Sequence, residues 1–263
     1  MRDPDYLLSN HHSQAGQRFV ALAELFDEST FRHFERIGMA PGWCCWEVGA
    51  GGCSVVRWLS DRVGHCGRVL ATDIDTSWAR EATGGNIEVR EHNLITDPPP
   101  EELFDLIHAR LVLMHLPKRV RALEIMVGAL RPGGWLVIED TDFNLQPLSC
   151  LNTDTSAAQR ANKIRAAFAE LLVRHGVDLS WGRKVPQLLR DVGLAEVCAD
   201  AYCPIAMPGS RRLEIGNIEF LRSRLVSEGF VSEDELEQHL TLVRGGTLDV
   251  STSVIISAWG RKP

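Results

Sequence analysis

Residues 43–54 read WCCWEVGAGGCS, and this stretch decides the fold. Its apolar first half predicts a short buried strand over Trp43–Val48, and the pattern of Ser54–Val63 predicts an amphipathic helix directly after it. The glycines between them let the backbone turn tightly and approach a ligand without a Cβ clash. The free N–H groups of the helix point into that turn. The stretch is typical of a ligand-binding strand–turn–helix unit, with a plain tight turn as the alternative.

Strands and helices continue to alternate on both sides of this unit. Further strands are predicted at Arg68–Thr72, Ile87–Arg90, Phe104–Ala109 and Trp135–Glu139, and a helix at Pro117–Leu130 that Pro132-Gly133-Gly134 stops. Such alternation is typical of a parallel sheet with helices on both faces. The second half predicts helices over 154–175, 183–192, 211–229 and 233–244, and strands at Leu194–Cys203 and Val250–Trp259. Residues 13–37 predict a helix interrupted at Asp27 and Ser29, with a second short helix from Phe31.

Length and charge narrow the class of protein. The chain has 263 residues, with 28 basic against 35 acidic side chains and a net charge of −7, which argues against a nucleic-acid partner because phosphate binding needs a basic face. No apolar run approaches the roughly 20 residues of a membrane helix, and the first residues form no apolar signal segment. The seven cysteines lack zinc-site spacing. We expect a cytoplasmic protein with reduced thiols, no membrane partner, and a monomeric or homodimeric state.

A second signal indicates the kind of ligand at the glycine turn. Asp73 ends the next predicted strand, 22 residues after Gly51, where a doubly wound fold places an acidic residue against a ribose diol. A carboxylate accepts hydrogen bonds from two hydroxyls at once. We therefore expect an adenosine-type cofactor at the carboxyl edge of the sheet.

Two features favour S-adenosylmethionine (SAM) over NAD(P). Ser54 stands at the third glycine position of the dinucleotide fingerprint, and Glu47, two positions before the first glycine, suits an ammonium group and would repel a pyrophosphate. A short-chain dehydrogenase also needs a tyrosine followed four residues later by lysine, and neither Tyr6 nor Tyr202 has that neighbour. An NAD(P)-dependent oxidoreductase stays the alternative.

With these features the chain resembles the class I SAM-dependent methyltransferases. EVGAGG at 47–52 is similar to the family's first motif, ATDID at 71–75 to its second, and EHNL at 91–94 lies where the family contacts adenine. FDLIHARLVLMHLP at 104–117, LRPGGWLVIED at 130–140 and STSVIISAWGRKP at 251–263 are similar to its fourth, fifth and closing antiparallel strands. The resemblance is closest to small-molecule enzymes of menaquinone biosynthesis and their relatives in secondary metabolism.

The resemblance implies a fold and its divisions. It implies an α/β, Rossmann-like, doubly wound, seven-stranded mixed sheet whose last strand is antiparallel, with a helical cap. The expected divisions are an N-terminal helical lid at 1–40, a SAM-binding core at 41–142, a helical insertion and core helix at 143–193, and the last two strands at 194–263 with a cap insertion at 207–248.

The resemblance also implies which residues hold SAM. Gly49, Ala50 and Gly51 would pass along its methionine and ribose, Glu47 would accept from its ammonium, and Asp73 would hold the ribose hydroxyls. The adenine would contact Ile74, Asn93 and Leu94, and the methionine end would face Tyr6, Arg18, Ala109 and Arg110. For Ile74 the alternative is core packing, and for Arg110 a surface position. The chain departs from the family with Cys53 where glycine is frequent and with Asn93 where aspartate is frequent.

Methyl transfer is an in-line displacement, so alignment supplies much of its rate. His115, just after the fourth strand, is the best candidate for a general base, and a structural histidine is the alternative. The acceptor site is expected to include His11, His115, Asp142 and Phe143. No metal is expected, because His108-Ala109-Arg110 at the end of the fourth strand does not resemble the metal-dependent members.

The sequence thus predicts an enzyme that transfers the methyl group of SAM to an oxygen, nitrogen or carbon of a small organic acceptor, with S-adenosylhomocysteine as the second product. An aromatic or polycyclic natural product is the expected acceptor. A non-catalytic or cyclase-like protein on the same fold is a further alternative.

Overall fold

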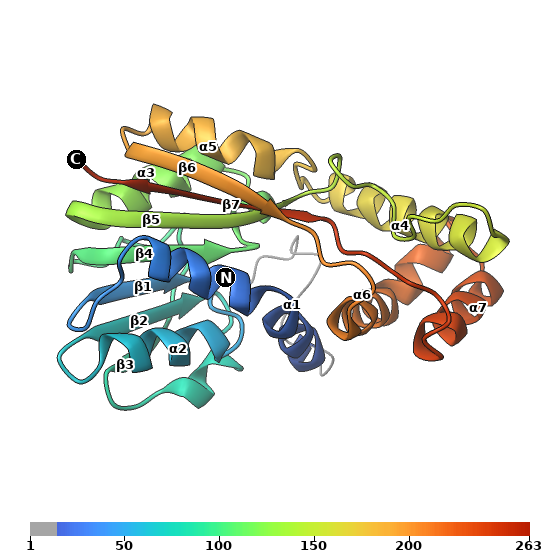
Figure 1. Cartoon of the computed structure of the whole chain (residues 1–263), viewed down its shortest axis with the longest axis horizontal. Coiled ribbons are helices and arrows are strands. Elements are labelled where there is room, and N and C mark those ends of the chain that lie inside the picture. The colour runs from blue at the N-terminus through green and yellow to red at the C-terminus, as the bar shows by residue number, and fades with distance from the viewer. Residues whose placement is uncertain (1–14) are drawn as a thin grey trace.

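A seven-stranded mixed sheet forms one half of the molecule (Figure 1). The computed structural model describes residues 15–263, so the predictions for Tyr6 and His11 lie outside the described residues. The strand order is β3-β2-β1-β4-β5-β7-β6, with β7 antiparallel to both of its neighbours and the first five strands parallel. The strands are β1 (Cys44–Val48), β2 (Arg68–Asp73), β3 (Ile87–Glu91), β4 (Phe104–Arg110), β5 (Leu130–Asp142), β6 (Ala195–Tyr202) and β7 (Val254–Arg261). The predicted Rossmann-like sheet with an antiparallel last strand is confirmed.

Helices cover both faces of this sheet because its strands are apolar on both sides. Cys45 and Leu106 face α1 (Ala15–Arg36) and α2 (Ser54–Val63), where Phe34 and Leu59 pack on them. Alternate residues such as Trp46 face the other side, which is covered by α3 (Arg119–Ala129) and α5 (Trp181–Asp191). The chain runs outward through β1, β2 and β3 and returns to β4 on the far side of β1. The strand order therefore reverses between β1 and β4, where open α/β sheets bind their ligands.

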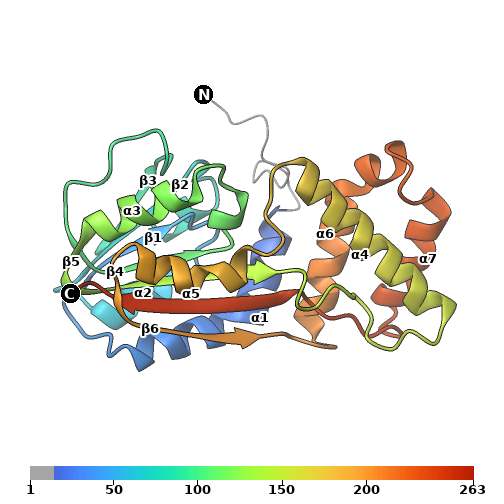
Figure 2. The same ribbon diagram turned by 90° about the horizontal axis from the view of Figure 1, so that it is seen from above.

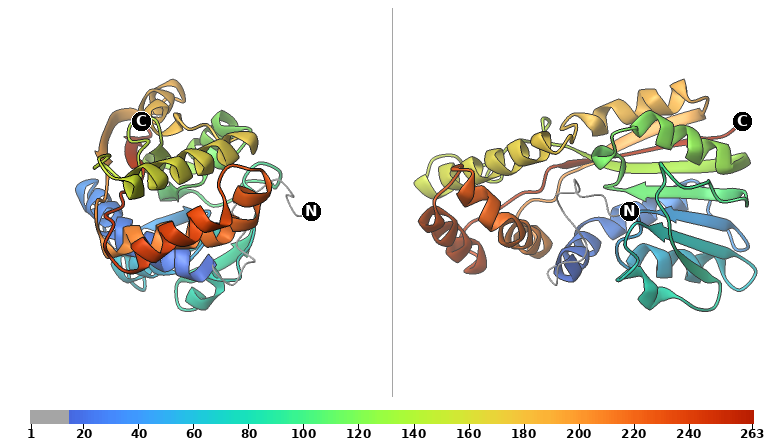
Figure 3. Two further views of the ribbon diagram at one scale, coloured as in Figure 1. Left: turned by 90° about the vertical axis from the view of Figure 1, so that its right-hand side faces the viewer. Right: turned by 180° about the vertical axis from the view of Figure 1, so that it is seen from behind.

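The other half of the molecule is a helical cap. It consists of α4 (Ser156–Arg174), α6 (Pro208–Ser227) and α7 (Glu233–Arg244), which lie together beyond the carboxyl edge of the parallel strands (Figures 1 and 2). The view from the cap end shows these helices in front of the sheet (Figure 3). Helix α1 packs along α6 and reaches back to α2, so it joins the cap to the sheet. No helix within residues 15–263 has the length and apolarity to span a membrane.

Three predicted boundaries are corrected by the structure. Helix α1 runs without a break, because Asp27 in its middle accepts from Arg110 rather than ending the helix. Strand β5 begins at Leu130 and not at Trp135, directly after α3 ends at Ala129, so Gly133 and Gly134 lie inside the strand at a shift of its register with β4. Strand β7 begins at Val254, and the residues just before it turn toward the cap.

Two short 3-10 turns complete the elements, at η1 (Ala79–Ala82) and η2 (Leu113–His115). The cap helix α7 begins with the predicted capping box, in which Ser232 and Glu235 each bind the backbone N–H of the other.

Candidate active site

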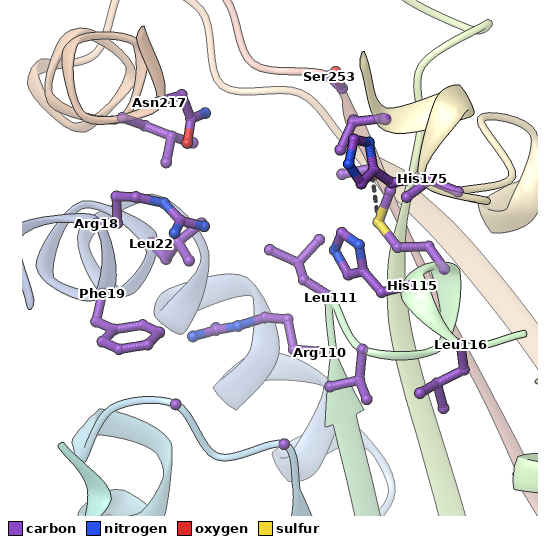
Figure 4. A pocket seen from close by; sticks show the side chains of 18 of the residues that line it. Arg18, Phe19, Leu22, Arg110, Leu111, His115, Leu116, His175, Asn217 and Ser253 are labelled. Atoms are coloured by element: carbon purple, nitrogen blue, oxygen red, sulfur yellow. Dashed lines mark hydrogen bonds between the residues drawn. The ribbon is translucent and has the colours of Figure 1, made fainter. Parts of the chain in front are cut away.

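A cavity of about 500 Å³ lies at the carboxyl edge of the parallel strands, between the sheet, α1 and the cap. Its walls come from α1, the glycine turn after β1, the ends of β2, β3 and β5, the segment after β4, the facing sides of α4 and α6, and residues 251–253. Its size falls within the range of small-molecule sites. Figure 4 shows side chains from α1, the β4 segment and the cap pointing toward a common space.

The glycine turn lies in close contact with α1 and with the segment after β4. Gly49 and Gly51 have φ angles of 65° and 56°, which side chains rarely adopt. A Cβ on Gly49 would lie 2.3 Å from Val112 Cγ2, and one on Gly51 would lie 2.6 Å from Phe19 Cε1. Both glycines line the cavity, so the prediction that this turn approaches a ligand is consistent with its geometry.

Asp73 ties the glycine turn to the end of β2. Its Oδ2 accepts from the N–H of Gly51 at 2.9 Å, and its Oδ1 accepts from the N–H of Asp75 at 2.9 Å. The side chain lines the cavity, and burial raises its pKa despite those backbone hydrogen bonds. Beside it, Ile74 is 45% exposed, a large apolar side chain left uncovered at the cavity wall.

The segment after β3 forms the neighbouring wall. Asn93 and Leu94 line the cavity as predicted. The amide oxygen of Asn93 accepts from the N–H of Ile95 at 3.0 Å, so this side chain shapes its own loop. Its amide nitrogen is the part of the side chain that this hydrogen bond leaves available.

Two arginines and a strained leucine form a further wall of the cavity. Arg110 donates to Asp27 Oδ1 and Thr30 Oγ1, each at 2.9 Å, so α1 fixes its guanidinium at the cavity edge. Arg18 lines the cavity from α1 (Figure 4). Leu111 has a φ of 58°, a conformation that costs a bulky side chain about 1–3 kcal/mol and that clusters at functional sites.

His115 lies at the end of η2 and lines the cavity (Figure 4). Burial, Arg18 and Arg119 lower its pKa to about 4. The ring is therefore neutral at ordinary pH and has a nitrogen able to accept a proton. Phe143, which follows β5, also lines the cavity as predicted.

Four predicted site residues lie outside the cavity lining. Glu47 is buried on the α1 side of the sheet, where its Oε2 lies 2.7 Å from His108 Nδ1, so it supports the fold and does not reach the cavity. Asp142 is fully buried, held by Arg183 and by the N–H groups of the following turn. Ala50 packs into the core beside α2, and Ala109 into the core beside α3. The alternation of side chains along β1 turns Glu47 away from the face of Val48, which does line the cavity.

The sequence analysis named Arg18 on α1 and expected a helical cap, but it did not name the other side chains that α1 and the cap contribute. Phe19 and Leu22 line the cavity from α1, and Thr141 lines it from β5. The facing sides of α4 and α6 contribute residues at helical spacing, among them Ile164, Phe168 and Leu172, and Ser210, Glu214 and Asn217. The helical periodicity of both segments was visible in the sequence, but periodicity cannot say what a helix packs against.

Comparison with known families decides the class of this fold. Residues 46–138 match the family model described as a methyltransferase domain. The matched segment and the strand order are those of the class I SAM-dependent methyltransferases, whose fold this chain shares. The matched segment runs from β1 to β5 and therefore contains the glycine turn, Asp73 and the segment after β4.

Three relatives show how far the similarity extends. The chain is 24% identical to phosphoethanolamine N-methyltransferase 1 of Arabidopsis thaliana, over 83% of this chain and 41% of that protein. It is 29% identical to the ubiquinone/menaquinone biosynthesis C-methyltransferase UbiE of Hydrogenovibrio crunogenus, over 44% of this chain and 50% of that protein. The structure of Haemonchus contortus phosphoethanolamine N-methyltransferase 2 superposes with a TM-score of 0.61 at 12% identity, over 100% of this chain and 61% of the other. The chain thus spans half or less of the length of the two sequence relatives.

Proposed function

We propose that this protein is a SAM-dependent methyltransferase that acts on a small organic acceptor with an aromatic or polycyclic body. The observation that carries the proposal is the arrangement at one cavity of the glycine turn, the buried Asp73 carboxylate and the neutral His115. The family match over residues 46–138 includes all of these residues, whereas the cap helices lie outside it.

The cavity lining fits SAM better than a dinucleotide. A dinucleotide places its pyrophosphate over the N-terminus of the helix that follows the glycine turn. That end of α2, with Cys53 and Ser54, is not part of the cavity lining, whereas Asp73 and the exposed Ile74 are. Asp73 would hold the ribose hydroxyls, Ile74 and Leu94 would contact the adenine, and Arg18 and Arg110 would face the methionine carboxylate. When bound there, SAM supplies a methyl group already activated by its sulfonium.

The protein's own residues would then align the acceptor and manage its proton. The walls formed by Phe143 and Phe168, whose ring centroids are 6.1 Å apart, offer an apolar seat for a flat acceptor. His115 stays neutral at ordinary pH, so its imidazole is able to take a proton from a hydroxyl or amine as the new bond forms. Helix α1 and the cap each cover part of this space.

Calorimetry tests the choice of cofactor. We expect SAM and S-adenosylhomocysteine to bind the full chain and NAD⁺ and NADP⁺ to show no comparable heat. Tighter binding of NAD⁺ than of S-adenosylhomocysteine would replace the proposal with an oxidoreductase. Binding of S-adenosylhomocysteine must be joined by methyl transfer from labelled SAM to some hydroxylated aromatic acceptor. Tight binding with no transfer to a broad acceptor panel would instead support a non-catalytic or cyclase-like protein.

A further inference from the structure

The cap end of the cavity has two walls of different character. Helix α4 presents Ile164, Phe168 and Leu172, which are apolar and follow one another at helical spacing. Helix α6 presents Ser210, Glu214 and Asn217 at the same kind of spacing, so a polar stripe faces the apolar one. A ligand between them would meet an apolar surface on one side and hydrogen-bonding groups on the other.

The charges at this end of the cavity neutralise each other. Arg165 donates through Nη1 to Ser253 Oγ at 2.9 Å and through Nη2 to the carbonyl oxygen of Ser251 at 2.7 Å, and its Nη2 lies 3.7 Å from Glu214 Oε2. Glu214 Oε1 also accepts from Ser149 Oγ and lies 3.1 Å from His239 Nε2. Burial by itself raises the pKa of Glu214, but His239 and Arg165 outweigh it and lower the pKa, so the carboxylate stays charged. The guanidinium is therefore committed to a buried carboxylate and to the chain before β7.

Three polar groups at this end of the cavity make no hydrogen bond to any residue within 15–263. They are Ser210 Oγ, Thr252 Oγ1 and Asn217 Oδ1. Ser210 is 2% exposed and Thr252 is 5% exposed, so neither reaches bulk solvent. Because buried polar groups in proteins are almost always paired, these three point to a polar partner within the cavity. All three are uncharged, and the amide oxygen of Asn217 needs a donor.

We infer, on the basis of the proposed function, that the cap end of the cavity selects an uncharged acceptor with a flat apolar body and a hydroxyl group at the end remote from the methylated atom. The hydroxyl would donate to Asn217 or accept from Ser210 and Thr252, while the apolar body lies against Phe143 and Phe168. Ser210, Thr252 and Asn217 are then the specificity-determining residues of the acceptor site.

The same geometry disfavours a phosphorylated acceptor. A phosphate group carries close to two negative charges and needs several cationic or N–H donors. At the cap end it would meet Glu214, and the guanidinium of Arg165 is already paired with that carboxylate. An acceptor such as phosphoethanolamine would therefore meet a carboxylate there, and a guanidinium that is already paired with it.

The test compares three probes on the full chain saturated with S-adenosylhomocysteine. Calorimetry measures the Kd of 1-naphthol, of 1,5-dihydroxynaphthalene and of phosphoethanolamine. We expect the second hydroxyl to tighten binding about tenfold, the worth of roughly one well-placed hydrogen bond. Phosphoethanolamine is expected to bind more weakly than either naphthol.

The double variant Ser210→Ala with Thr252→Val locates that effect. It should bind S-adenosylhomocysteine as the wild type does and reduce the preference for the second hydroxyl to within about twofold. Ser223→Ala with Thr241→Val makes the same chemical changes at exposed positions on α6 and α7 and should keep the tenfold preference. Melting temperatures of both variants check that they fold.

Several results would overturn the inference. These are equal binding of the two naphthols to the wild type, no binding of either, tighter binding of phosphoethanolamine, or an unchanged preference in the Ser210/Thr252 variant. Failure of S-adenosylhomocysteine to bind would count against the proposed function alone, because the two naphthols can then be compared on the chain without it.

Discussion

Asp73 is the residue on which the cofactor site depends most. Its carboxylate joins the glycine turn to β2 through Gly51 and Asp75, and it faces the cavity. Asp73→Ala should raise the Kd of S-adenosylhomocysteine about 100-fold or more, because two hydrogen bonds to a charged acceptor are lost and each contributes about 1.5–3 kcal/mol. Calorimetry measures this, and Asp61→Ala on the exposed side of α2 is the matched control. An unchanged Kd would remove Asp73 from the site.

His115 is expected to act through its neutral ring. Its pKa is lowered to about 4, so the ring is unprotonated above that pH and loses its basic nitrogen below it. On the acid side of the pH profile, the kcat of the wild type should therefore stay constant from neutral pH downward and fall only as the pH approaches about 4. His115→Ala should lower kcat about 10²–10⁴-fold and leave the Kd of S-adenosylhomocysteine nearly unchanged.

Other outcomes for His115→Ala assign it a different role. A raised KM for the acceptor with kcat intact would make it a binding residue, with alignment alone carrying the rate. A lowered melting temperature with no change in kcat or KM would make it a packing residue of η2.

Asp140 and Asp142 bear on the expectation that no metal is needed. Asp140 Oδ2 accepts from Trp181 Nε1 at 3.0 Å, and Asp142 is bound by Arg183. Within residues 15–263 no group of three or more His, Cys, Asp or Glu side chains is placed to hold a metal ion. Because Asp140 and Asp142 are already bound by Trp181 and Arg183, we expect activity to be unchanged after dialysis against EDTA, measured as methyl transfer with and without added Mg²⁺. A reversible requirement for Mg²⁺ would contradict this.

How far single residues could be predicted depends on whether local spacing determines them. Gly49, Gly51 and Asp73 follow from the strand–turn–helix pattern, because their positions relative to two adjacent strands are set by a few bonds. Glu47 lies in the same motif, but the role of its side chain depends on its partner, which is His108 on β4. That pairing with His108 is a long-range contact that spacing does not encode.

At the scale of elements, a buried charge network holds α1 against the sheet. His108 lies between Glu47 and Glu139, with Nδ1 2.7 Å from one and Nε2 3.4 Å from the other. On α1, His33 Nδ1 lies 3.0 Å from Glu139 Oε1, and His33 Nε2 lies 3.0 Å from Asp200 Oδ1. Burial by itself lowers the pKa of His108, but the two glutamates outweigh it and raise the pKa to about 9. Because α1 also carries Arg18 and Phe19, the network positions one wall of the cavity.

This network predicts a loss of stability at high pH. The pKa of His108 is about 9 in the folded chain against an ordinary 6.5, so its contribution is complete below pH 6.5 and is lost as the pH rises through 9. The melting temperature should fall between about pH 7 and about pH 10. His108→Gln should lose much of that pH dependence and unfold about 3–5 kcal/mol more easily, because Glu47 is left buried without its cation, while Glu139 keeps His33.

His65→Gln is the control for this experiment, since His65 is exposed. It should keep the stability and the pH dependence of the wild type. If His108→Gln kept the full pH dependence, the network would not be its cause.

At the scale of the whole molecule, the sheet and the presence of a helical cap were predictable, but the side chains that the cap turns toward the cavity were not. The strands of the sheet are apolar, short and separated by turn residues, so each is visible locally, and their order follows from the family's motifs. The cap helices were predicted as helices, but α4 and α6 are far apart in sequence and meet only in space. Their polar and apolar stripes form the acceptor end of the cavity, so the chemistry of the acceptor could not be predicted without the fold.

The cavity connects the two halves, and this predicts how the whole chain responds to its cofactor. A ligand that binds only the folded chain stabilises it by about 2.7 kcal/mol at a concentration one hundred times its Kd. For a chain of this size that corresponds to a rise in melting temperature of about 5–10 °C. Because α1 contributes to the cofactor wall and packs along α6, we expect S-adenosylhomocysteine to move one transition that includes both sheet and cap. Differential scanning calorimetry measures it, and Asp73→Ala at the same ligand concentration should show a smaller rise. A separate early transition that the ligand leaves in place would mean that the cap unfolds independently of the cofactor site.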